Sequence, residues 1–173
     1  MDATQEREFV SKKFFENLNE LVKFYRTLLE LLRKEKEVLI LADIKRLAQI
    51  NKDKEDLIYK IRTLDLNREC CAKELVQVFQ FDLPVPRLLE IARLMGGAEG
   101  EHLRQIHATL DVLVNRSFNL NKENEEFTQS ALSTLNGALA EIKGTLAGKP
   151  VYGQKGKMAV GPEKAGNFIS KEV

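Results

Sequence analysis

The sequence predicts an all-α protein, an elongated up-and-down bundle of long helices with coiled-coil-like seams and a flexible C-terminal tail. No glycine or proline precedes Pro84, apolar residues recur every three or four positions, and half of the ten glycines lie after residue 146. Long breaker-free stretches with this period are typical of amphipathic helices. We therefore expect a helical domain over 1–146 and a flexible, basic Gly/Lys-rich tail over 147–173.

The first helix is predicted over about 8–41. Its apolar residues alternate in steps of three and four, as in a coiled-coil seam, and Glu35 alone interrupts them. The series consists of Phe14, Leu18, Leu21, Tyr25, Leu28, Leu32 and Leu39.

The second helix is predicted over about 43–81, because a new apolar series begins out of phase with the first. Asp43 is a plausible N-cap at this break, since a short carboxylate can accept a backbone N–H of the first turn. The second series consists of Leu47, Ile50, Leu57, Ile61, Leu64, Cys71, Leu75 and Val78.

Two further helices follow the proline-containing segment D-L-P-V-P. A short one is predicted over about 87–95, and a long one over about 99–146 after the glycine pair at 96–97. The long helix carries first Leu103, Ile106, Leu110, Leu113 and Leu120, and later Leu132, Leu135, Leu139, Ile142 and Leu146.

An asparagine cluster lies where the apolar stripe of the last helix changes phase. The stretch F-N-L-N-K-E-N-E-E-F contains Asn119, Asn121 and Asn124, although asparagine is a poor helix former. Asn124 occupies a position where the apolar series of the last helix predicts an apolar residue. We interpret Asn121 and Asn124 as register residues, where the helix passes from bundle partners to another protein. The alternative is that all three are solvated surface residues.

Composition and charge exclude several classes of function. The 27 basic and 26 acidic residues nearly cancel to a net charge of +1, which argues against a nucleic-acid surface, although binding through the basic tail stays a weak alternative. The longest apolar run, Val38–Ala42, is too short for stable membrane insertion, and the N-terminus lacks a signal-peptide pattern, so we expect a cytoplasmic protein.

No pattern of catalytic residues or cofactor ligands stands out, so we expect a protein without enzymatic activity or cofactor. His102 and His107 are five residues apart and point in different directions on a helix, which separates them as metal ligands. Cys70 and Cys71 are interpreted as reduced thiols, with Cys71 in the core; a redox or metal role is the alternative.

Several stretches of the sequence together carry a family resemblance. The first two helices contain L-L-E-L-L-R-K-E-K-E-V-L-I-L-A-D-I-K-R-L and L-A-Q-I-N-K-D-K-E-D-L-I-Y-K-I-R-T-L. More specific is N-K-E-N-E-E-F-T-Q-S-A-L-S-T-L, followed by P-V-Y-G-Q-K-G-K. These stretches resemble the FlgN family of flagellar type III export chaperones. The final segment Asn167–Val173 departs from the family pattern and has no role that the resemblance assigns.

The resemblance implies a cytosolic chaperone that binds the C-terminal ends of the hook-associated proteins FlgK and FlgL and delivers them to the flagellar export gate. Client binding is expected at Leu132, Leu135, Leu139, Ile142 and Leu146, if these residues are not used by the bundle itself. Docking to the cytosolic domain of the gate is expected at Val151, Tyr152 and Gly153. The alternative function is a helical coiled-coil adaptor or scaffold without an export client, and the seams leave a homodimer open.

Overall fold

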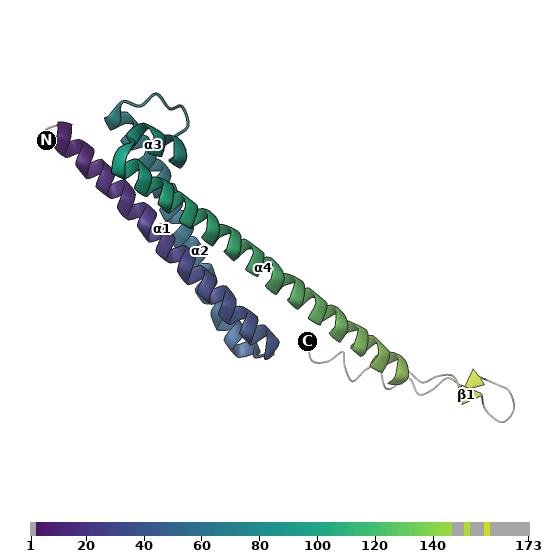
Figure 1. The fold of residues 1–173 in the computed structure, drawn as a ribbon. Coiled ribbons are helices and arrows are strands. Elements are labelled where there is room, and N and C mark those ends of the chain that lie inside the picture. Colours follow the sequence, from purple (N-terminus) through teal and green to yellow (C-terminus); the bar gives the residue numbers. More distant parts are fainter. Residues whose placement is uncertain (1–2, 147–150, 153–157, 160–173) are drawn as a thin grey trace. The chain divides into compact units, whose positions relative to one another are not determined.

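The computed structural model describes residues 3–146, 151–152 and 158–159. Within them the chain forms the helices α1 (Ala3–Ile40), α2 (Ile44–Phe79), α3 (Leu88–Met95) and α4 (Gly97–Leu146), and the two-residue strands β1 (Val151–Tyr152) and β2 (Met158–Ala159) (Figure 1). The strands pair with each other in antiparallel register. The predicted all-α fold class is confirmed.

The chain divides into two compact units, Met1–Asn124 and Glu125–Val173, and α4 contributes to both. The expected domain boundary after residue 146 stays a prediction. Most of the expected tail, including Gly153 and the segment 167–173, lies outside the described residues.

The first unit is an up-and-down arrangement of three long helices and the short α3. Ion pairs join Lys13 to Glu74 and Glu35 to Lys54, so α1 and α2 run antiparallel, side by side (Figure 1). The contacts between α1 and α4 advance in the same direction along both helices. Ser11 Oγ donates to Glu99 and, further along both helices, Lys36 pairs with Glu123. α1 and α4 are therefore parallel.

The core of the first unit collects the apolar faces of all four helices. Its largest fully buried side chains are Phe14, Leu18, Leu32, Leu75, Ile91 and Leu103. Cys71 is buried in the same cluster, as its place in the α2 series predicts. These apolar faces explain why the helices pack together, because an amphipathic helix gains most of its stability by burying its apolar stripe.

The helix ends follow from local backbone chemistry. Asp43 caps α2 as expected, since its carboxylate accepts the backbone N–H of Arg46 at 3.1 Å. Gly96 and Gly97 have φ angles of 62° and 51°, which lets the chain turn sharply between α3 and α4. Gly100 is buried at this corner, where a Cβ atom would collide with the carbonyl oxygen of Ala92.

Candidate functional site

The apolar stripe in the second half of α4 is exposed. We use the name client stripe for Leu132, Leu135, Leu139, Ile142 and Leu146, whose side chains are between 42% and 56% exposed. Their spacing of three and four places them along one side of the helix. Isolated exposed leucines are ordinary, but a contiguous apolar row is typical of an interaction surface.

The buried seam of α4 ends before this stripe begins. Leu103, Ile106, Leu113, Ser117 and Asn124 are buried, whereas every residue from Gln129 to Leu146 is exposed. Asn124 is also the last residue of the first compact unit. The client stripe therefore belongs to the unit Glu125–Val173.

A buried polar layer joins three helices at the end of the buried seam. Asn124 is 3% exposed, and its Nδ2 donates to the carbonyl oxygen of Leu32 at 2.9 Å and to Glu35 Oε2 at 3.0 Å. The other carboxylate oxygen of Glu35, Oε1, lies 2.6 Å from Lys54 Nζ of α2. Each of α1, α2 and α4 thus contributes one polar side chain.

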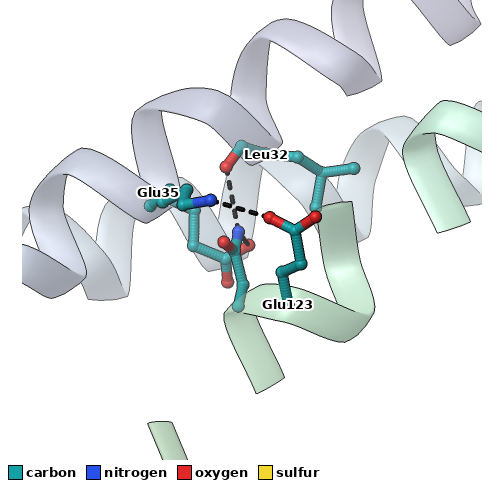
Figure 2. A network of polar contacts seen from close by, with 5 residues as sticks. Leu32, Glu35 and Glu123 are labelled. Atoms are coloured by element: carbon teal, nitrogen blue, oxygen red, sulfur yellow. Dashed lines mark hydrogen bonds and ion pairs between the residues drawn. The ribbon is translucent and has the colours of Figure 1, made fainter. Parts of the chain in front are cut away.

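The three asparagines have different environments. Asn119 and Asn121 are exposed, whereas Asn124 is buried. The alternative in which all three are solvated is therefore wrong for Asn124, while its role as a register residue stays a proposal. Next to Asn124, an exposed ion pair joins α1 to α4, with Lys36 Nζ 2.7 Å from the Glu123 carboxylate (Figure 2).

Sequence reasoning missed two members of this layer. Glu35 was visible as the interruption in the apolar seam of α1, and such an interruption indicates a buried polar partner elsewhere. Lys54 had no comparable pattern, because lysines are common on the exposed face of α2. Only the packing of α1 against α2 identifies it.

The expected gate-docking residues fall in the second unit. Val151 and Tyr152 form β1, in which Val151 pairs with Ala159 and Tyr152 with Met158. Gly153 lies outside the described residues. Their docking role stays a prediction.

The residues considered for redox or metal chemistry are not brought together. Cys70 is exposed and Cys71 buried, both as free thiols, and burial raises the pKa of the Cys71 thiol, which favours the unreactive protonated form. His102 stacks on Phe15 with ring centroids 4.9 Å apart, while His107 lines a groove beside α3. Among the described residues, no group of three or more His, Cys, Asp or Glu side chains could hold a metal ion.

Fold and site together define a class of protein, a helical bundle in which the second half of α4 has an exposed amphipathic face. None of the described helices combines the length and hydropathy that a membrane span requires. The chain belongs to the FlgN family, because residues 10–159 match the family model described as FlgN protein. This is a family of flagellar export chaperones and not of enzymes, so the chain has the general role of a flagellar export chaperone. Searches of curated proteins and of solved structures gave no significant match.

Proposed function

We propose that this chaperone holds the C-terminal helical segments of FlgK and FlgL on the client stripe and delivers them to the export gate. The observation that carries the proposal is the exposure of all five stripe residues, Leu132, Leu135, Leu139, Ile142 and Leu146. The family membership supports the general chaperone role.

The physical logic is a helix-in-groove contact. A hook-associated subunit has a terminal helix whose apolar face is covered only in the finished filament, so it is prone to aggregate before export. A chaperone can cover that face with its own apolar row and release it without ATP, since no covalent step is needed. Each leucine that becomes fully buried contributes about 1.5–3 kcal/mol, which makes a few such contacts sufficient for reversible binding.

The test is the paired substitution Leu135→Ser with Leu139→Ser. We expect it to weaken binding of a FlgK C-terminal segment by more than about tenfold, because two apolar contacts are lost. Calorimetric titration measures the affinity, and circular dichroism establishes that the variant remains helical. A matched control is Ile44→Ser with Leu66→Ser, two apolar residues of α2 outside the stripe that are more exposed than Leu135 and Leu139. Unchanged binding by a folded stripe variant would remove the stripe as the client surface.

The same exposed row favours a second candidate function, self-association as an adaptor or scaffold. Two stripes could cover each other in a homodimer, which needs no export client. Sedimentation of the chain with and without the FlgK segment separates the two functions. A chaperone loses any self-association when the client binds, whereas a scaffold remains dimeric and the client does not bind.

Delivery requires a second contact, and we assign it to Val151, Tyr152 and Gly153. Their resemblance to the V-Y-G segment of family members supports this assignment, and they lie within the residues 10–159 that match the family model. Tyrosine suits a small docking site, because it combines a large apolar ring with a hydrogen-bonding hydroxyl.

A further inference from the structure

The packing of α4 on the other helices changes after Leu113. Up to that residue the buried side chains of α4 are apolar: Leu103, Ile106 and Leu113. Beyond it, the buried residues of α4 in the unit Met1–Asn124 are both polar, Ser117 and Asn124, and Leu120 is only partly buried. The hydrophobic effect therefore holds α4 on the bundle mainly up to Leu113. We use the name flap for residues 114–124.

The flap also has a low helix propensity. Its sequence V-N-R-S-F-N-L-N-K-E-N contains four asparagines and one serine, whereas residues 101–113 contain neither residue type. Asparagine and serine side chains compete with the backbone for its hydrogen bonds and so weaken a helix. The asparagine cluster thus coincides with the part of α4 that buries least apolar surface in this unit.

A gap lies between the flap and the other two long helices. It is an open pocket of about 260 Å³, whereas protein interiors are normally close-packed. Side chains that face such a gap lose van der Waals contacts, so they contribute less to holding the flap in place. Its lining residues are Tyr25, Leu28, Leu32, Lys54, Ile58, Val114, Ser117, Phe118 and Asn121.

A buried hydroxyl at this gap destabilises the closed arrangement. Ser117 is only 5% exposed, and its Oγ has no hydrogen-bond partner in the part of the chain that the structure describes. An unsatisfied buried polar group costs free energy, because it has lost its bonds to water. When the flap separates from the bundle, water can reach Ser117 and this cost disappears.

Polar contacts hold the C-terminal end of the flap on α1. Asn124 Nδ2 donates to the carbonyl oxygen of Leu32 and to the Glu35 carboxylate. Beside Asn124, Lys36 forms an ion pair with Glu123. Hydrogen bonds weaken steeply with distance and angle, so these contacts are lost together once the flap moves away from α1.

We infer that the flap opens locally from α1 and α2 while residues 97–113 of α4 stay packed, and that Asn124 is the clasp that keeps it closed. Opening exposes an apolar face of the α1–α2 pair, formed by Leu28, Leu32 and Ile58. Segments with few buried apolar contacts are the ones that open locally in folded proteins. The device needs no client, so its test is independent of the proposed function.

Native-state hydrogen exchange of the full chain, without any partner, tests the inference. We expect the protection factors of backbone amides in the flap to be at least about tenfold lower than those in 101–113. Low urea concentrations should accelerate exchange less in the flap, because local opening exposes less surface than global unfolding. Equal protection and equal urea dependence in the two segments would overturn the inference, since α4 would then open as one unit.

Ile106→Val distinguishes local opening from global unfolding. Ile106 stays packed when the flap opens, so its truncation should lower protection in 101–113 about fivefold and leave that of the flap within about twofold. An equal loss in both segments would show that the flap opens only with the rest of α4, which contradicts the inference.

Asn124→Ala tests the clasp. Loss of its two hydrogen bonds should lower protection in the flap about tenfold. The matched control is Asn67→Ala, the same change at an exposed position of α2, which should leave protection in the flap unchanged. Unchanged flap protection in Asn124→Ala would exclude this asparagine as the clasp.

Two further variants should close the flap more firmly. Asn119→Ala raises helix propensity at an exposed position and should increase flap protection about threefold. Ser117→Leu fills the gap and removes the unsatisfied hydroxyl, so a larger increase of about tenfold is expected. Circular dichroism establishes that the leucine variant remains helical, and Asn119→Ala decides the matter if it does not. Unchanged flap protection in Asn119→Ala would overturn the inference, because a locally unwinding segment must respond to its own helix propensity.

Discussion

At the scale of single residues, we propose that the layer of Glu35, Lys54 and Asn124 determines how three helices align. Both carboxylate oxygens of Glu35 are used, one by Lys54 and one by Asn124. A shift of α4 by one turn, about 5.4 Å, would separate Asn124 from both of its acceptors on α1. Buried polar groups of this kind specify register, because alternative alignments leave them unsatisfied.

The substitution Asn124→Leu tests this role. From the sequence alone, we would expect higher thermal stability, since leucine fits an apolar seam. The structure reverses the sign, because leucine would leave the Glu35 carboxylate without one of its two donors and Leu32 without its side-chain donor. We expect the free energy of unfolding to fall by about 1–3 kcal/mol, measured by urea denaturation.

The matched control replaces the whole layer by Glu35→Leu, Lys54→Met and Asn124→Leu. No charged or amide side chain of the layer is then buried without its partner, so stability should return to that of the unchanged protein or exceed it. Sedimentation should reveal weaker control of oligomeric state, as the register device is gone. A single Asn124→Leu variant more stable than the unchanged protein would contradict the account of this layer.

At the scale of the helices, the connection after α1 contains a strained residue. Ala42 has a φ angle of 52°, and the N–H groups of Ala42 and Asp43 bond back to the carbonyls of Leu39 and Val38. This pattern is a Schellman motif, in which glycine is preferred at the left-handed position. Ala42→Gly should therefore raise the free energy of unfolding by about 0.5–1 kcal/mol, measured by thermal or urea denaturation.

The control for this prediction is Ala48→Gly, at an exposed position inside α2. There the same substitution meets ordinary helical geometry and should destabilise by about 1 kcal/mol. If Ala42→Gly raises the free energy of unfolding and Ala48→Gly lowers it, backbone conformation decides the effect. Changes of the same sign in both variants would exclude this explanation.

The second half of α4 contains Gly137 at an interior position, where helical geometry does not require glycine. Gly137 has no atom within 4 Å of the position that a Cβ would take. Gly137→Ala should thus slow the hydrogen exchange of backbone amides around residue 137, because it raises the local stability of α4 by about 0.5–1 kcal/mol. Gly100→Ala is the contrasting variant, since its Cβ would strike the backbone of Ala92, and it should destabilise the first unit. Faster exchange around residue 137 in the alanine variant would contradict this reading.

At the scale of the whole molecule, the sequence predicted the helices closely because their ends carry local chemistry. Asp43, the prolines after α2 and the glycine pair at the start of α4 all mark boundaries that the structure contains. The beginning of α1 at Ala3 rather than near residue 8 was missed, because the first turns are polar and show no apolar period. Periodicity detects buried helix faces and not solvated turns.

The candidate site was only partly predictable. The spacing of the client stripe was visible in the sequence, but its exposure was not, because an apolar row looks the same whether covered or free. Likewise, Glu35 and Asn124 each stood out as an interruption of a seam. Their meeting, and the contribution of Lys54, depend on the parallel packing of α1 with α4 and the antiparallel packing of α1 with α2.

Chaperone function at this scale requires that client binding and delivery be separable. The client stripe and Tyr152 belong to different elements, α4 and β1. Lys149, Lys155 and Lys157 surround Tyr152 in the sequence and would steer it towards an acidic surface of the export gate. Tyr152→Ala should therefore leave FlgK binding and helical content unchanged, yet weaken binding to the cytosolic domain of the gate by about tenfold and reduce motility.

The matched control for Tyr152→Ala is Tyr152→Phe, which keeps the ring and removes only the hydroxyl. If the ring supplies most of the contact, the phenylalanine variant should retain most of the gate affinity, and the alanine variant should not. Parallel titrations with the FlgK segment and the gate domain measure the two activities on one protein. Equal loss of both would place Tyr152 at the client surface. Unchanged gate binding and motility in the alanine variant would show that delivery depends on another contact, because a docking anchor cannot be removed without lowering the affinity it supplies.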